Sequence, residues 1–447
     1  MFLIQMWLRC YATHTLTISN YRFSMAKNSE KYMSKDVTFE NSKNVPFQRW
    51  YPYIEGYSPD FVTAIISQNV PDATLIYEPF AGTGTTLFAS DSRHISTVYS
   101  EINPLLRFLI RSKMEILSMD AEVRHQKANR LRTLAMNILE LSNVCPESKD
   151  LKNSYKKVFG KSVYFPEDQY SKVLKLRTFI DELSKEDFVV ANLVTIACFA
   201  CLLPVSYLKK QGDVRFKTEK EKLTQMKTLE NTIPDKISQI ADDVDDVTIT
   251  INCNHQLVCP NAKRIGDYEV PNKIDAVITS PPYLNGTNYF RNTKLELWFL
   301  KELSNKDSLR LFRDDALTSA ICDVKKEYDN VEIDLHSPLL EKTLKRLKET
   351  AYDRRIPLMA KCYFSEMHEL FSGLKRHLNQ NAKLFIDLGD SIFGGVHIPT
   401  DLILTEVLEA IGYNFDERIV LRERRSRNNE IVSQVLLKYS YNSNVQI

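Results

Sequence analysis

The chain has 447 residues, of which 43% are hydrophobic and 26% are charged. This balance excludes a fibrous, collagen-like or wholly disordered protein, and the length predicts a catalytic-sized domain with one further unit of roughly 100 to 150 residues. The 59 basic and 57 acidic residues leave a net charge of +2. Because the chain is not a polycation, any nucleic-acid surface must come from local clusters.

The eight cysteines are scattered along the chain, which favours free thiols in a reducing compartment and predicts a cytoplasmic protein. Two apolar segments could be mistaken for targeting signals. Residues 1–8 have no basic residue before them and no small-residue cleavage site after them. We therefore expect residues 1–44 to be a flexible leader, or the product of a start codon assigned too far upstream, with Met25 or Met33 as the true beginning.

The second apolar segment, residues 188–208, contains 21 residues without a charge and is long enough to span a membrane. Its polar residues, the lack of a second such segment and the charged helices on either side favour a buried core helix and no membrane partner. Cys198 and Cys201 form a lone CxxC pair within it, without a partner pair or a histidine cluster nearby. We therefore expect buried thiols and no metal site.

The sequence pattern changes twice along the chain. Residues 45–115 combine short apolar strands with glycine turns and are predicted to form the first part of a catalytic domain. From 116 to 245 apolar residues recur three and four positions apart, which is typical of helices, and residues 246–447 form the second part of the catalytic domain. In that part we expect strands at 247–251, 274–279 and 383–388, and a helix at about 358–377. This order predicts an α/β fold, a doubly wound Rossmann-like sheet with a mainly helical insertion.

A glycine turn follows the first predicted strand of the catalytic domain. The apolar residues 75–78 lead into Gly82-Thr83-Gly84, and a helix is expected to start at Thr85. Glycine permits a tight turn and lets a ligand approach the backbone, and N–H groups at a helix start favour an anionic group such as a carboxylate. The spacing is not that of a P-loop. A ligand site and a purely structural turn both fit this motif.

The next predicted strand, residues 95–101, ends in Glu101, about twenty positions after the glycines. In a doubly wound sheet this position lies at the carboxyl edge beside the glycine turn, where a carboxylate can accept both ribose hydroxyls of a nucleoside cofactor. The alternative is a glutamate that only caps the helix expected to start near Asn103.

The tetrapeptide Ser280-Pro281-Pro282-Tyr283 directly follows the buried strand 274–279. Two prolines stop the strand and stiffen the chain, so the carbonyl groups of Ser280 and Pro281 have fixed directions and few internal donors. Rigid acceptors beside an aromatic ring suit a planar base with an amino group, because the carbonyls can accept from the amino group while Tyr283 stacks on the ring.

Together these motifs resemble those of the S-adenosylmethionine-dependent DNA amino-methyltransferases, which methylate exocyclic nitrogens of cytosine or adenine. The resemblance covers most of the chain outside the leader and the helical insertion. It implies a methyltransferase sheet, S-adenosyl-L-methionine as cofactor, double-stranded DNA as partner and a restriction-modification setting with a companion restriction endonuclease acting separately. It also implies that Ser280, Pro281, Pro282 and Tyr283 are catalytic. The residues implied to bind the cofactor are Ser58, Phe61, Glu78, Phe80, Ala81, Gly82, Gly84, Thr85, Glu101 and Asp267, the last through the adenine amino group.

The tetrapeptide indicates which amine is methylated. In this family serine at its first position favours cytosine N4, whereas aspartate or asparagine favours adenine N6, so we expect cytosine and keep adenine as the alternative. The cofactor motif precedes the catalytic motif, unlike in many cytosine-N4 enzymes. A carbon-5 methyltransferase would need a cysteine nucleophile in a Pro-Cys context, and the chain has no Pro-Cys pair, with Cys259-Pro260 in the reverse order. To reach a base inside a duplex, the enzyme is expected to flip it out.

Three basic clusters are candidates for DNA contact. Residues 209–227 contain seven bases and three acids, a second cluster of arginines runs from Arg418 to Arg427, and a third spans 342–355. Such runs can neutralise phosphates, but they can equally be solvated helix faces. Either the helical insertion or a segment at 304–355 could read the DNA sequence. The residues predicted to bind DNA are Lys209, Lys210, Arg215, Lys217, Arg424 and Arg425.

Two other functional classes remain open from the sequence. An RNA or protein methyltransferase could use the same cofactor scaffold and a Pro-Pro-Tyr loop. A DNA-binding subunit without activity is also possible, although both motifs are complete. The sequence contains no recognisable nuclease motif, and a methyltransferase without a partner nuclease would carry the same motifs.

Overall fold

The computed structural model describes residues 32, 37–53, 55–246, 248–324, 335–425 and 429–442. Most of the expected leader, with both alternative start methionines, lies outside the described residues, as does Arg427. The described part of the leader is packed against the sheet domain. Tyr32 and Val37 are about 5% and 4% exposed and belong to the same apolar cluster as Phe61.

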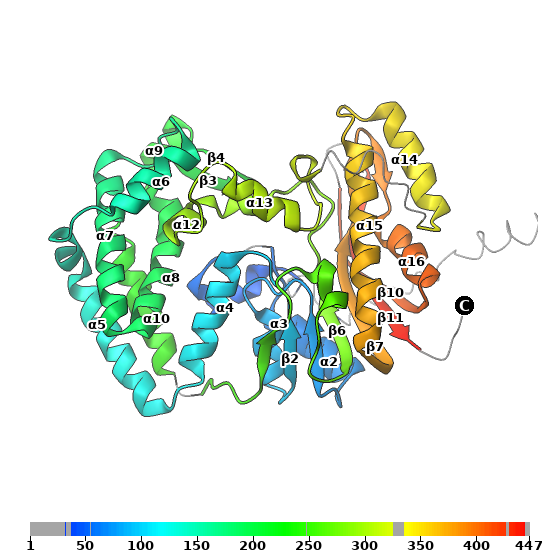
Figure 1. Cartoon of the computed structure of the whole chain (residues 1–447), viewed down its shortest axis with the longest axis horizontal. Helices are drawn as coiled ribbons and strands as arrows, with labels where there is room; N and C mark the ends of the chain where they lie inside the picture. Colours follow the sequence, from blue (N-terminus) through cyan, green and yellow to red (C-terminus); the bar gives the residue numbers. More distant parts are fainter. Residues whose placement is uncertain are drawn as a thin grey trace, which may run out of the picture.

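A seven-stranded sheet forms the centre of the sheet domain (Figure 1). Its order is β10-β11-β7-β6-β1-β2-β5, and the five strands from β7 to β5 are parallel, whereas β11 is antiparallel to both of its neighbours. The chain runs outward from β1 through β2 to β5 and then returns to β6 on the other side of β1. The strands are β1 (Leu75–Glu78), β2 (Ser96–Tyr99), β5 (His255–Leu257), β6 (Ile274–Thr279), β7 (Leu378–Gly389), β10 (Tyr413–Arg425) and β11 (Ile431–Tyr441).

Helices cover both faces of this sheet. Successive strand residues point to opposite faces, so Tyr77 and Val277 pack with residues of α15, whereas Ile76 and Ala276 pack with residues of α2. The predicted doubly wound α/β fold is therefore confirmed. The elements around the sheet are η1 (Phe39–Asn44), η2 (Gln48–Trp50), α2 (Pro59–Asn69), α3 (Thr85–Asp91), α4 (Pro104–Leu117), η3 (Ala262–Asp267), α14 (Pro338–Thr350), α15 (Ile356–Leu374), η6 (Lys375–His377), β8 (Ser391–Phe393), β9 (Val396–Ile398) and α16 (Thr400–Ala410).

The expected helical insertion forms a separate layer of helices, at the left of Figure 1. Its central helix is α8, which contacts α4, α5, α7 and α10. This helix is long and apolar enough to cross a membrane, but 78% of it is buried inside the protein, and Cys198 and Cys201 are buried with it. The expectation of a core helix is confirmed. The elements are α5 (Ala121–Asn143), α6 (Lys149–Phe159), α7 (Glu167–Glu186), α8 (Phe188–Val205), β3 (Leu208–Gln211), β4 (Asp213–Phe216), α9 (Glu219–Gln225) and α10 (Ile233–Asp245).

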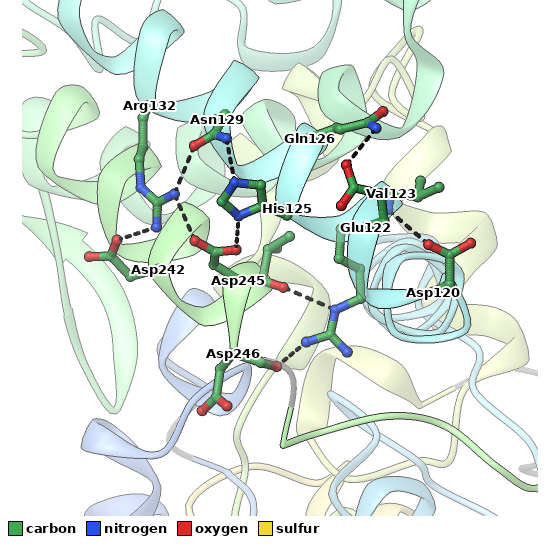
Figure 2. Close-up of polar contacts among 12 residues, drawn as sticks. Asp120, Glu122, Val123, His125, Gln126, Asn129, Arg132, Asp242, Asp245 and Asp246 are labelled. Carbon is green, nitrogen blue, oxygen red and sulfur yellow. Dashed lines mark hydrogen bonds and ion pairs between the residues drawn. The ribbon is translucent and has the colours of Figure 1, made fainter.

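Polar side chains join α5 to α10 at the surface of this layer (Figure 2). The Nδ1 atom of His125 lies 2.8 Å from the Asp245 carboxylate, and Arg132 donates to Asp242 and Asp245 at 3.1 and 2.8 Å. These side chains are partly exposed, and such pairs each contribute about 0 to 1 kcal/mol. They orient the two helices, whose association is stabilised mainly by the apolar cluster beneath.

The expected strand at 247–251 is wrong. Val247 lies outside the described residues, and residues 248–251 form no strand. Ile249 and Ile251 instead pack against the apolar cluster of the helical layer, and the Ile251 amide donates to the Leu117 carbonyl at 3.2 Å. Packing has overridden the strand preference of a β-branched run. The strand beside β2 is the short β5, which begins at His255.

The chain after β6 crosses back to the helical layer before it returns to the sheet. There Trp298 donates its indole N–H to the Leu151 carbonyl at 3.1 Å, which fixes α12 against α6. Residues of this segment consequently lie over the carboxyl ends of the strands. Its elements are α11 (Tyr289–Asn292), α12 (Lys294–Phe299), α13 (Ser308–Asp315) and η4 (Ile321–Asp323).

Candidate active site

A cavity of about 420 Å³ lies where β1, β2 and β6 end. Strand order reverses between β1 and β6, and open α/β sheets bind their ligands at such a point. The cavity is lined by the glycine turn after β1, by the residue after β2 and by the tetrapeptide after β6. The predicted site residues that it brings together are Phe80, Ala81, Gly82, Thr85, Glu101, Ser280, Pro281, Pro282, Tyr283 and Arg424.

The turn after β1 requires glycine at two positions. Gly82 and Gly84 have φ angles of +55° and +90°, which side chains disfavour. A Cβ at Gly84 would lie 2.8 Å from the Phe88 ring, and one at Gly82 would lie 3.3 Å from the Tyr53 ring. Gly82 lines the cavity, whereas Gly84 lies behind it and begins α3.

Two buried ionisable side chains, those of Glu78 and Lys113, form hydrogen bonds with the main chain of this turn. Glu78 accepts hydrogen bonds from the Thr86 hydroxyl at 2.7 Å, from the Phe80 amide at 3.0 Å and from the Tyr57 hydroxyl. The Lys113 ammonium donates to the Thr83 carbonyl at 3.0 Å, and burial lowers its pKa to about 7. Glu78 does not line the cavity, so the structure gives it a supporting position rather than the predicted contact with a ligand.

Glu101 connects the first two strand ends. Its carboxylate accepts from the Gly82 amide and from the Asn103 amide, both at 2.8 Å, and it lines the cavity while only 7% exposed. Burial raises the pKa of Glu101 to about 7, and the two backbone N–H groups oppose that shift. The cap of α4 is Asn103, whose side chain accepts from the Leu105 amide at 3.0 Å, so Glu101 faces the cavity and does not itself cap the helix.

The ring of Tyr283 is fixed from two directions. Its hydroxyl donates to Asp387 at 3.0 Å, and the Gln434 amide donates to both Asp387 and Tyr283. A Cβ at Gly389 would lie 2.9 Å from the Tyr283 ring, so this glycine forms a close backing for it. Burial raises the pKa of Asp387 to about 6. Sequence motifs pointed to Tyr283 but not to Asp387 or Gln434, which bind its hydroxyl.

The carbonyl groups of the tetrapeptide are available to a ligand. Within the described part of the chain, no hydrogen bond reaches the carbonyl oxygens of Ser280 or Pro281. The Ser280 hydroxyl lies 3.5 Å from the Tyr283 hydroxyl. Ser280, Pro281 and the fixed ring of Tyr283 thus line the same cavity, and contact of the two carbonyl groups with a ligand stays a prediction.

The segment before α2 reaches the cavity through other residues than those predicted. Ser58 is the buried N-cap of α2 and accepts from the Phe61 amide at 3.3 Å, and Phe61 itself belongs to the apolar core. Neither lines the cavity. Their neighbours Tyr53, Glu55, Gly56 and Tyr57 do.

Asp267 is also outside the cavity, which corrects its predicted contact with adenine. Its side chain is 61% exposed and pairs with Arg264 at 3.1 Å on the surface. Because β5 already ends at Leu257, the residues that reach the carboxyl edge are those that follow soon after it. Residues 260–263 line the cavity in place of Asp267.

The predicted DNA-binding residues of the helical layer are engaged within the protein. Lys217 is buried and donates to the Pro204 and Ser206 carbonyls at 3.0 and 2.6 Å, and burial lowers its pKa to about 8. A buried ammonium cannot reach a phosphate, so the prediction for Lys217 is corrected. The other three are in ion pairs: Lys209 and Arg215 with Glu221, and Lys210 with Glu55. Arg424 and Arg425 are exposed at the end of β10.

The helical layer contributes directly to the cavity wall. Gly212, at the turn between β3 and β4, lines the cavity. Asn292 holds this turn by donating to the Gly212 carbonyl at 3.1 Å and accepting from the Val214 amide at 2.9 Å. Nothing in the sequence pattern indicated this contact, because the partners are about 80 residues apart.

No protein-family model matches the chain. The chain is 27% identical over 430 residues to the type II methyltransferase M.AvaI of Nostoc sp., covering 88% of this chain and 84% of that protein, and the values for M.AvaI of Anabaena variabilis are the same. It is 24% identical over 463 residues to the type II methyltransferase M.BsoBI of Geobacillus stearothermophilus, covering 93% and 88%. Among solved structures, the rRNA methyltransferase aviRa from Streptomyces viridochromogenes aligns over 87% of this chain and 86% of its own, with 9% identity and a TM-score of 0.28. These sequence relatives align with most of the chain and are type II methyltransferases.

Proposed function

We propose that the protein transfers a methyl group from S-adenosyl-L-methionine to the N4 amino group of cytosine in duplex DNA, within a restriction-modification system. The observation that carries this proposal is the single cavity at the switch point, which contains the glycine turn, Glu101 and the tetrapeptide together. The similarity to type II methyltransferases over most of the chain supports it. A companion restriction endonuclease would act separately on the same sites.

The residues of the cavity fit the proposed cofactor. The buried carboxylate of Glu101 could accept ribose hydroxyls, and Ala81 and Gly82, which line the cavity with little or no side chain, permit close approach of the methionine part. Phe80 and Ala262 supply apolar surface for the adenine ring. When bound, the cofactor supplies an electrophilic methyl group on a sulfonium.

The tetrapeptide would prepare the amino group of the target base. A cytosine amino nitrogen is a poor nucleophile because its lone pair is delocalised into the ring. The carbonyls of Ser280 and Pro281 accept its hydrogens, which favours a pyramidal nitrogen, and Tyr283 holds the plane of the base by stacking. Catalysis then rests on placement and electrostatics without a covalent enzyme intermediate.

Serine at position 280 favours cytosine over adenine. Adenine N6 remains the second candidate, since the same acceptors would serve either amino group. An RNA substrate is the third, because the cavity chemistry alone does not select duplex DNA.

Expression in a bacterial host without DNA methylation tests the proposal directly. We expect N4-methylcytosine in the nucleosides of digested genomic DNA, measured by mass spectrometry, and its absence with the Pro281→Ala variant. N6-methyladenine would retain the mechanism and overturn the choice of base. No modified base from folded, cofactor-binding protein would contradict DNA methylation and favour an RNA substrate.

Cofactor affinity should depend on pH through Glu101. Since the pKa of this carboxyl is raised to about 7, it is protonated below that pH and then accepts fewer ribose hydrogen bonds. Glu78 lies near enough to raise this pKa further and Arg107 to lower it. Calorimetric affinity for S-adenosylmethionine should therefore be highest above pH 8 and fall by up to about ten-fold per pH unit below 7.

The Glu101→Gln variant provides the control. It should bind the cofactor more weakly than the parent protein above pH 8 and show no fall attributable to this residue between pH 6 and 8. An equal pH dependence in both proteins would assign the titration to another group.

A further inference from the structure

A single aromatic side chain projects from the loop between α14 and α15. Tyr352 is 75% exposed, which is unusual for so large a ring. Basic groups predominate around it in the sequence: Arg354 and Arg355 follow, and the solvent face of α14 exposes four bases and two acids, namely Lys342, Lys345, Arg346, Lys348, Glu341 and Glu349. Asp353, within the loop, is held by Arg355 at 2.7 Å. The loop therefore combines a free aromatic ring with an excess of positive charge.

Two successive contacts connect this loop to residues beside the cavity. A Cβ at Gly394, in the turn between β8 and β9, would lie 2.9 Å from Ala351, so this turn packs directly on the residue before Tyr352. The Phe393 ring of the same turn lies 3.9 Å from the Cβ position of Gly286, and the flanking residues Asn285 and Thr287 line the cavity.

The other side of the loop approaches the cavity as well. Arg355 lies near enough to Cys322 to interact electrostatically with it, and the adjacent Asp323 lines the cavity. Figure 1 shows α14 and α15, which contact each other, side by side. The neighbours of Tyr352 in the loop are thus linked, through intervening residues, to two separate parts of the cavity wall, while its own side chain is exposed.

A base that leaves a duplex creates a gap, and proteins fill such gaps with apolar or aromatic side chains. Stacking of an aromatic ring on a nucleobase is favourable whatever the base, while nearby basic side chains neutralise the adjacent phosphates. Tyrosine suits this role because its ring has few rotatable bonds. We propose that Tyr352 enters the DNA duplex and occupies the space of the target base when that base moves into the cavity. This inference rests on the proposed function.

Fluorescence of 2-aminopurine separates base flipping from binding. The probe is a short duplex with the sequence methylated in the host genome and 2-aminopurine in place of the target base, whose emission rises when it leaves the stack. We expect Tyr352→Ala to shift the equilibrium between the stacked and the flipped-out base about ten-fold toward the stacked state. At saturating protein its emission should then fall clearly below that of the parent protein, and the rate of duplex methylation should fall with it. Tyr352→Phe should behave like the parent protein.

Two controls come from the same chain. Lys345→Ala, on the basic face of α14, should weaken binding and its salt dependence but leave emission at saturation unchanged. Leu223→Ala removes a side chain that is 88% exposed in the helical layer and should change neither quantity. All variants should keep the cofactor affinity of the parent protein.

The outcomes distinguish this inference from the proposed function. If Tyr352→Ala lowers affinity but retains full emission at saturation, Tyr352 is only a surface contact and the inference is wrong. The inference is also wrong if the variant changes neither DNA affinity nor emission. The exposed ring would then be available to contact a protein partner instead. If the parent protein neither methylates nor binds DNA, the proposed function fails first and the inference with it.

Discussion

A valine at Gly82 is expected to lower the affinity for S-adenosylmethionine by at least about 100-fold while the protein remains folded. The φ angle of +55° disfavours a β-branched residue, at a cost of about 1 to 3 kcal/mol. The added carbons would also meet the Tyr53 ring, 3.3 Å from the Cβ position. If the turn shifts to relieve the backbone strain or the contact with Tyr53, the Gly82 amide moves relative to the Glu101 carboxylate that accepts from it. The part of the cavity formed by the turn and Glu101 is then distorted. Calorimetry with the cofactor measures the loss.

Gly160→Val is the matched control for this change. Gly160 has a similar φ of +63°, but no atom lies within 4 Å of its Cβ position, and it lies in the helical layer away from the cavity. It should lower the melting temperature through backbone strain and leave cofactor affinity unchanged. If both variants lose affinity equally, general destabilisation rather than the geometry of the turn explains the effect.

The strands nearest the cavity were predictable because their signals are local. Residues 274–279 are a run of apolar and β-branched residues that two prolines terminate, and the structure has β6 at those residues. The strand before the glycine turn is likewise β1 at its expected position. Local sequence also identified the parts of the cavity wall that directly follow β1, β2 and β6, since parallel strands deliver the residues after them to one edge of the sheet.

The failures arise where tertiary contacts decide. Residues 248–251 have strand-forming side chains, but the apolar surface of the helical layer takes them up. Asp267 matched an acidic position by motif spacing, yet the strand before it ends ten residues earlier. Lys217 belongs to a basic run by composition but donates to three main-chain carbonyls in the interior. None of these outcomes is encoded within a short window of sequence.

The support of Tyr283 is the clearest example of a feature that sequence reading missed. Asp387 and Gln434 are 104 and 151 residues from Tyr283, and the pairing of β7 with β11 brings them together. Aspartate within an apolar strand is a weak signal by itself. Its meaning depends on the buried hydroxyl and amide that it satisfies.

Replacing Gly389 with alanine should lower the rate of methyl transfer by about 100-fold and leave cofactor affinity unchanged. Gly389 lies in β7 without a positive φ, so alanine introduces no backbone strain. Its Cβ would lie 2.9 and 3.0 Å from two atoms of the Tyr283 ring, closer than carbon atoms approach. The ring must therefore move toward the cavity and displace the target base, and a positional error of about 1 Å can lower a rate 100-fold.

A double-mutant cycle with Tyr283 tests this cause. Tyr283→Ala removes the ring and should itself abolish most activity while cofactor binding persists. Adding Gly389→Ala to that variant should then have no further effect, because the clash no longer exists. Tyr283→Phe keeps the ring but loses the bonds to Asp387 and Gln434, so it should retain sensitivity to Gly389→Ala. If the two effects instead multiply in the Tyr283→Ala background, Gly389 acts through the strand and not through the tyrosine. Tyr283 is assigned to the target base, whereas the glycine turn and Glu101 are assigned to the cofactor. Loss of cofactor binding by Tyr283→Ala would contradict this assignment, because it would place the ring against the cofactor.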